Sequence, residues 1–203
     1  MPRPTHGGRL AGLIAAPPEG LCLDFVNTRY WRGSASPVDE LQAIGDVLAW
    51  SATKAGVDPA IATPLGAAWA AHPPAAAAAF GAAVALRETL HRLFGAVAAA
   101  RPVAPADFSA LDAGLAEAAP RARLVSRQRD YLWDTTLTGR TASALLSPVL
   151  WSAADLLAGG RRQLVRQCAN PRCGWLFLDD SKSGNRRWCS MAACGNRAKA
   201  IWD

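Results

Sequence analysis

Apolar side chains recur every three to four residues over most of the chain before Pro120, which is the spacing of one helix face. Proline and glycine residues interrupt this pattern at intervals and separate one helix from the next. The pattern predicts helices over 21–30, 37–55, 58–71, 74–100, 106–118 and 141–157. On the solvent side of the longest one, Glu88 is expected to pair with Arg92 at i,i+4.

Two stretches depart from the helical period. Residues 9–14 are predicted to form a short strand, and residues 122–126 and 130–135 are predicted to form a hairpin around Arg127-Gln128-Arg129. The chain is therefore expected to be mainly α with a small β-hairpin.

Charge divides the chain into two parts. Residues 159–203 contain nine Lys or Arg and three Asp or Glu, so they carry the whole net charge of +6. Residues 1–158 are electrically balanced. Gly159-Gly160 is a plausible hinge between the two parts. We therefore expect a mostly helical domain over 1–158 and a basic module over 159–203.

Four of the five cysteines lie in the basic module, as Cys168-x4-Cys173-x15-Cys189-x4-Cys194. Two close pairs about fifteen residues apart are typical of a four-thiolate zinc site. Two disulfides would use the same residues, but no secretory signal supports an oxidising compartment. Iron–sulfur ligation and free thiols are the remaining alternatives. We expect one structural zinc ion, whose closed coordination leaves no position for a catalytic water.

The sequence between the cysteine pairs predicts the local fold of the module. Trp175–Asp179 is expected to be a strand, and Arg186–Trp188 is expected to return beside it after a polar turn. Ser190 can cap a helix running from Met191 to about Ile201. This arrangement is typical of a treble-clef-like or zinc-ribbon-like finger. Its tryptophans either pack the hairpin or stack on bases, and loss of one zinc ligand is expected to unfold the module alone.

Cys194-Gly195-Asn196-Arg197, the two C-x4-C pairs and the turn Asn170-Pro171-x-Cys173-Gly174 together resemble the CGNR zinc-finger family of bacterial proteins. The segment 21–28, LCLDFVNT, resembles the opening motif of the domain that precedes this finger, called ABATE. The family is described as stress-induced transcription regulators. The resemblance therefore implies that the finger binds nucleic acid.

The basic residues of the finger suggest how it would bind. Arg186 and Arg187 flank a turn and are expected to meet phosphates, whereas Asn196 and Lys199 face outward on the helix, where Asn196 can read a base edge. Arg197 either contacts phosphate or partners groups within the finger. We expect DNA as the partner, with RNA as the alternative. One short finger should bind weakly by itself, so a homodimer or a partner is expected to supply further contacts.

In the helical domain, Asp24, Asn27, Thr28 and Arg29 lie close together in the first predicted helix and its exit. They either cap and pair within the fold or line a polar pocket for a small effector. No nucleophile–base pair or carboxylate dyad stands out, so we do not expect an enzyme. An active site near Asp24 and Asn27 is the enzymatic alternative.

These observations favour a transcription regulator whose helical domain senses an effector and whose finger binds DNA. The competing reading is a protein-interaction or dimerisation module with a structural zinc. No apolar run reaches the roughly 18 residues that a membrane span needs. The apolar patch Leu10–Ala16 is short for a signal peptide, so we expect a cytoplasmic protein.

Overall fold

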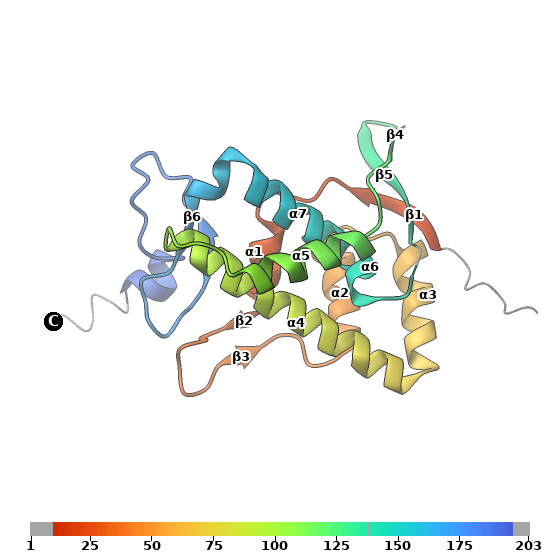
Figure 1. The fold of residues 1–203 in the computed structure, drawn as a ribbon, viewed down its shortest axis with the longest axis horizontal. Coiled ribbons are helices and arrows are strands. Elements are labelled where there is room, and N and C mark those ends of the chain that lie inside the picture. Colours follow the sequence, from red (N-terminus) through yellow and green to blue (C-terminus); the bar gives the residue numbers. More distant parts are fainter. Residues whose placement is uncertain (1–9, 138, 197–203) are drawn as a thin grey trace, which may run out of the picture.

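The computed structural model describes residues 10–137 and 139–196 (Figure 1). Its centre is the long helix α4 (Pro73–Ala98), whose Leu90, Leu93 and Phe94 are fully buried. Helices surround α4 on several sides, which confirms the expectation of a mainly α chain. They are α1 (Leu21–Val26), α2 (Ile44–Lys54), α3 (Pro59–Ala70), α5 (Pro105–Glu117), α6 (Ala142–Leu145) and α7 (Ser147–Ala158).

Helix starts follow the capping signals in the sequence. The Asp58 carboxylate accepts a hydrogen bond from the Ala60 N–H at 2.8 Å and so caps α3. Helices α3, α4 and α5 all have proline in the first turn, where the missing N–H costs nothing. These three helices lie within about two residues of the predicted bounds, because punctuation by proline is a local signal.

A three-stranded antiparallel sheet stands beside the helices, with the order β1 (Leu10–Ala15), β5 (Asp130–Leu137), β4 (Arg123–Arg127). Ile14 lies opposite Trp133 and its side chain is buried against the helical core. The predicted strand and hairpin are thus confirmed. The pairing of β1 with β5 joins residues far apart in the sequence, and local patterns do not encode it.

Two predicted helices begin or end elsewhere. Helix α1 stops at Val26, and the following chain forms a small ladder between β2 (Arg29–Tyr30) and β3 (Val38–Asp39), so the predictions of helix over 27–30 and from residue 37 were wrong. Helix α2 starts only at Ile44, because the Asp46 carboxylate accepts from the N–H groups of Gln42 and Ala43 and caps it there.

The helix predicted over 141–157 is divided into α6 and α7. The break falls at Leu146, just before Pro148, which has no N–H to continue the helical ladder. The Thr141 hydroxyl accepts from the Ala144 N–H at 3.1 Å and caps α6. Most side chains of the two resulting helices are buried.

The expected pair between Glu88 and Arg92 was wrong. The Arg92 guanidinium bonds instead to the carboxylate of Asp107 on α5 at 2.6 Å. The Glu88 carboxylate accepts from Arg32 at 2.6 Å and from Arg87 at 3.1 Å. Residues of other elements thus replace the local partner, although the Arg92 side chain stays largely exposed.

A buried ion cluster fixes the 28–39 segment onto α4. Arg87 is fully buried and donates two hydrogen bonds of 2.6 Å to the Asp39 carboxylate and one of 3.2 Å to the Thr28 hydroxyl. Burial alone would raise the pKa values of the Asp39 and Glu88 carboxyls, but the bonds and charges of Arg87 and Arg32 outweigh it and lower both pKa values. Both carboxylates are therefore charged near neutral pH.

The C-terminal part of the chain packs into the same core as the helices. Its segments are the 3₁₀ turn η1 (Gly160–Leu164) and the antiparallel strands β6 (Val165–Gln167) and β7 (Leu176–Leu178). Val165 and Leu176 are 1% and 0% exposed and belong to the main hydrophobic core. The residues after Gly159 contact α7 and α4 rather than forming an open linker. Within the described ranges, no helix is both long and apolar enough to cross a bilayer.

Candidate metal centre and nucleic-acid interface

The four cysteines of the C-terminal module come together at one point. Cys168 follows β6, Cys173 lies in the turn between β6 and β7, and Cys189 and Cys194 flank the start of the short helix η2 (Met191–Gly195). Their sulfur atoms all lie within 4.8 Å of one another. The Ser190 hydroxyl accepts from the Ala193 N–H, which confirms the predicted cap of this helix.

The sulfur spacing fits zinc and not a disulfide. Cys189 Sγ lies 3.7 Å from the Sγ atoms of both Cys173 and Cys194. Zinc bonds of about 2.3 Å in a tetrahedron place two sulfurs about 3.8 Å apart. A disulfide would require about 2.05 Å, and none of the five cysteines is in a disulfide. The chain thus holds one structural zinc ion, with no open coordination position.

Electrostatics within the cluster call for a cation. Burial, reinforced by the charge of Cys168, raises the pKa of the Cys173 thiol to about 12, and burial with the charges of Cys173 and Cys168 also raises the pKa of the Cys189 thiol. Burial also acts against the Cys168 thiolate, but hydrogen bonds from the backbone at Cys189 and Asn170 outweigh it and lower its pKa. Asn170 Nδ2 also donates to Cys194 Sγ at 3.6 Å. Four thiolates this close need a divalent ion between them.

The body of the protein holds the Cys173 turn through its backbone. The Arg32 N–H donates to the Cys173 carbonyl and the Gly33 N–H to the Arg172 carbonyl, both at 3.2 Å. His91 Nε2 donates to the Gly174 carbonyl at 3.0 Å. A Cβ atom on Gly33 would lie 2.0 Å from the Pro171 carbonyl oxygen, so only glycine permits this approach.

Aromatic side chains cover the cysteine cluster. Trp31 of the body and Trp175, Phe177 and Trp188 of the finger pack against it while partly buried. Of the two roles considered for Trp175 and Trp188, the structure shows packing. A finger this small has no room for a separate core, so aromatic rings over the thiols exclude water from the site.

The hairpin of the finger differs from the predicted one. Strand β7 pairs with β6, which precedes it, whereas residues 186–188 are not in a strand. The reason is Asp179, whose carboxylate accepts from the N–H and hydroxyl of Ser181 and from the N–H of Arg186. These bonds shape residues 179–186 as a loop instead of a ladder.

The basic residues predicted to contact nucleic acid have different surroundings. The Arg186 guanidinium lies over the Phe177 ring at 4.7 Å and bonds to the carbonyls of Trp188 and Cys189, so it supports the finger itself. Arg187 is exposed and lies over the Trp188 ring. Asn196 is exposed, as expected. Arg197 and Lys199 lie outside the described residues.

Two further cations of the finger are exposed. Arg172, at the tip of the Cys173 turn, and Lys182, in the loop after β7, are exposed and form no ion pair within 10–137 and 139–196. They were not among the predicted contacts. The position of Arg172 between Cys168 and Cys173 is the sequence signal that could have identified it.

Comparison with protein families agrees with this architecture. Residues 19–160 match the ABATE family, described as "putative stress-induced transcription regulator", and residues 165–201 match the CGNR zinc finger. The chain belongs to the ABATE family. Among curated proteins, none matches it significantly.

The opening motif of this ABATE protein connects its two parts. Asn27 Nδ2 donates to the Leu176 carbonyl at 2.8 Å, and Asn27 Oδ1 accepts from the Leu176 N–H at 3.1 Å. Thr28 is buried and bonds to the Phe25 carbonyl and to Arg87, while Arg29 lies 3.7 Å from Glu88. Asn27 therefore satisfies both backbone groups of a strand residue in the finger.

Asp24 differs from its neighbours, because its carboxylate is exposed. Its surroundings still keep part of the water away from the carboxyl, which raises its pKa, while the charge of Lys54 acts against that rise. With Asn27, Trp175 and Phe177 it borders a groove of about 250 Å³ between α1 and β7. Of the four predicted pocket residues, Asn27, Thr28 and Arg29 thus bond within the fold, whereas Asp24 lies at the edge of a groove.

We expect Asn27→Ala to destabilise this ABATE protein by about 2 kcal/mol or more, because both Leu176 backbone groups lose their partner in a part-buried position. Urea denaturation of the zinc-loaded protein measures the loss. Asp24→Ala is the matched control on the same helix and should change stability by less than about 0.5 kcal/mol. Equal effects of the two substitutions would contradict the connecting role of Asn27.

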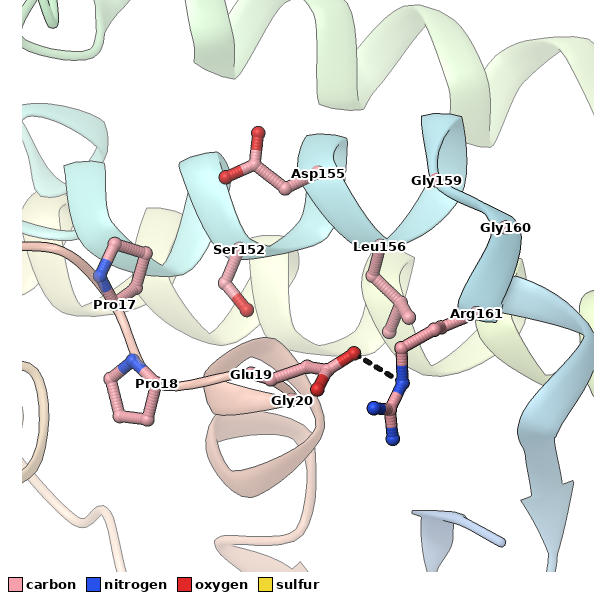
Figure 2. A pocket seen from close by; sticks show the side chains of 10 residues that line it. All are labelled: Pro17, Pro18, Glu19, Gly20, Ser152, Asp155, Leu156, Gly159, Gly160 and Arg161. Carbon is pink, nitrogen blue, oxygen red and sulfur yellow. Dashed lines mark ion pairs between the residues drawn. The ribbon is translucent and has the colours of Figure 1, made fainter. Parts of the chain in front are cut away.

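A second cavity, of about 310 Å³, lies where the body meets the finger (Figure 2). Its walls are Pro17–Gly20, the end of α7 and the segment 159–161. Arg161 bonds to Glu19 at 2.5 Å across the cavity and also to Asp180 in the finger loop. Asp155 points away from the cavity in Figure 2 and pairs with Arg121. The Ser152 hydroxyl accepts from the Cys22 N–H at 3.1 Å.

Proposed function

We propose that this ABATE protein regulates transcription by binding duplex DNA through its zinc finger. The observation that carries the proposal is the segregation of charge: residues 159–203 hold nine basic and three acidic residues, and the rest of the chain is neutral. A zinc ion with four thiolates contributes about −2, which leaves the finger near +4. Such a surface attracts phosphate backbones.

The structure narrows the set of usable cations. Arg161 and Arg186 are engaged within the fold, so we assign the phosphate contacts to Arg172, Lys182 and Arg187. Arg197 and Lys199 can add to this set. Asn196 is the proposed base-reading residue, because its amide is exposed on the finger helix and can pair with a base edge.

We propose that the helical part is a sensor that acts through the cavity of Figure 2. A small molecule bound there would touch the chain before α1, the end of α7 and Arg161 together. Any ligand that draws Arg161 away from Asp180 would release one attachment of the finger loop. The ion pair therefore offers a direct route from effector to finger.

A regulatory rather than catalytic role is part of the same proposal. Asn27 is one of the two residues near which an active site was considered. Both polar atoms of its amide form hydrogen bonds with the Leu176 backbone. The described residues show no hydrogen-bond partner for the Asp24 carboxylate that could act as nucleophile or base. The four-thiolate zinc ion has no open ligand position.

The test is the affinity of variants for duplex DNA over a range of salt. Arg187→Ala should lower the magnitude of the log–log salt slope by about 0.9, because one phosphate contact releases about one counterion. Asn196→Ala should change the preference between sequences more than the overall affinity. Arg186→Ala should instead weaken zinc retention, since its guanidinium bonds to the Cys189 carbonyl.

Arg101→Ala is the matched control, because Arg101 is exposed on the body and its substitution removes the same charge as Arg187→Ala. It should leave the slope unchanged. If Arg101→Ala and Arg187→Ala reduce binding equally, the attraction is only a net-charge effect. If zinc-loaded protein self-associates or captures a protein but binds no nucleic acid, the finger is an interaction or dimerisation module instead.

A further inference from the structure

The hairpin formed by β4 and β5 extends beyond the helices of the body (Figure 1). Leu124 and Tyr131 lie on the face that continues the core side of the sheet, yet they are 53% and 68% exposed. They are two of the most exposed large apolar residues in the described chain. This end of the sheet therefore projects past the helices, and its apolar face is not covered by the body.

The tip of the hairpin is basic. Arg127 and Arg129 are both exposed, and neither forms an ion pair among the residues that the structure describes. The nearest acid in the ladder, Asp130, lies opposite Arg127. Lower down, Arg121 is neutralised by Asp155 and Arg123 by Asp134. The two arginines of the tip thus outnumber its single acid, Asp130.

The turn itself has an unusual backbone. Arg127 pairs with Asp130, so only Gln128 and Arg129 connect the strands, and Gln128 has φ 55°. Glycine or asparagine is the usual residue in such a turn, because a side chain at positive φ costs free energy. The sequence keeps polar, hydrogen-bonding side chains here at that cost.

The hairpin and the finger lie at opposite ends of the long axis, and the hairpin and the loop after β7 both project at the upper edge of Figure 1. The finger attaches to α4 at His91, and the sheet packs on α3, which leads into the start of α4 at Pro73. Eighteen helical residues span about 27 Å. The helical body therefore separates the two surfaces, and a duplex that meets both has to extend along the body.

We propose that the tip of the β4–β5 hairpin is a second binding surface for the phosphate backbone of duplex DNA, contacted through Arg127 and Arg129. The inference rests on the proposed function of the finger and extends it to a two-point contact. Arginines on a β-ribbon suit phosphates and the edge of a groove. Tyr131 adds an exposed ring beside the sugar–phosphate chain.

The experiment measures affinity of the zinc-loaded full chain for duplexes of about 8 and about 24 base pairs, which span about 27 and 82 Å. Wild-type protein should gain more affinity on the longer duplex than the larger number of sites explains. The double variant Arg127→Ala, Arg129→Ala should lose that excess, and its salt slope on the long duplex should fall by about 2. Both arginines are exposed, so the variant should fold normally.

Lys54→Ala with Arg101→Ala removes the same charge from exposed sites on α2 and after α4, and should keep the length dependence. If the hairpin variant binds both duplexes like wild type, while Arg187→Ala weakens binding, the hairpin inference fails and the proposed function stands. If no variant or wild type binds either duplex, both fail. If the hairpin variant abolishes a protein dimer and leaves DNA binding unchanged, the hairpin pairs with a second copy and the inference is overturned.

Discussion

Removing zinc is expected to lower the melting temperature of the whole chain in a single transition, and not only to unfold the finger. Val165 and Leu176 belong to the helical core, and burial of each such side chain is worth about 1.5–3 kcal/mol. Asn27 and the 31–33 segment also lose their partners when the finger unfolds. The sequence alone predicts a different result, in which loss of zinc unfolds the finger and the body stays folded.

Far-UV circular dichroism reports the helices, nearly all of which are in the body, so melts with and without a chelator test this directly. A loss of several kcal/mol corresponds to a fall of roughly 10 °C for a chain of this size. Cys168→Ser should reproduce the chelated curve. Cys22→Ala is the control, since Cys22 is buried in the body outside the zinc site and its variant should still respond to chelator. An unchanged helical melt after zinc removal would show that the two parts fold independently.

Arg87→Ala should destabilise the zinc-loaded protein by about 3–5 kcal/mol, because it leaves the Asp39 carboxylate without its main cation and removes one of the two arginines bonded to Glu88 in a part-buried cluster. Arg92→Ala is the matched control on the same helix. Arg92 also pairs with a carboxylate, but its side chain is 58% exposed, so the loss should stay within about 1 kcal/mol. Urea denaturation of both variants gives the comparison.

The pH dependence of stability separates the ion cluster from simple loss of packing. Pairing lowers the pKa values of Asp39 and Glu88 in the folded protein. Their contribution to the free energy of unfolding is therefore complete above the unfolded-state pKa values near 4, and it is lost as the pH falls through the folded-state pKa values. Arg87→Ala should lack the part of this acid-sensitive contribution that comes from Asp39, whereas Glu88 keeps its bond to Arg32. A variant that loses less than about 1 kcal/mol, or that keeps the wild-type acid dependence, would contradict the role of the cluster.

The parts of the fold with local signals were predictable. The starts of α3, α4 and α5 at a proline and the cysteine spacing of the zinc site depend on neighbouring residues, and the structure confirms both. The end of α1 at Val26 depends on distant partners, because Asn27 bonds to Leu176 and Thr28 to Arg87. No periodicity within residues 21–30 contains that information.

The candidate interface was predictable in charge but not in geometry. The sequence places Arg186 and Arg187 side by side in a basic module, and both were expected to meet phosphates. Asp179 folds the loop so that Arg186 turns back onto Phe177 while Arg187 stays exposed. Which of two adjacent arginines is free depends on a backbone bond seven residues away, and only the folded structure shows it.

The most direct test of the account is the affinity of the zinc-loaded wild-type chain for nucleic acid, measured by fluorescence anisotropy with duplex DNA, single-stranded DNA and RNA at several salt concentrations. The account predicts binding of duplex DNA that weakens with a log–log salt slope of about −3 to −5, corresponding to three to five phosphate contacts. It also predicts that chelation abolishes this binding. Absence of binding to all three below millimolar concentration at low salt, with zinc present, would contradict the account.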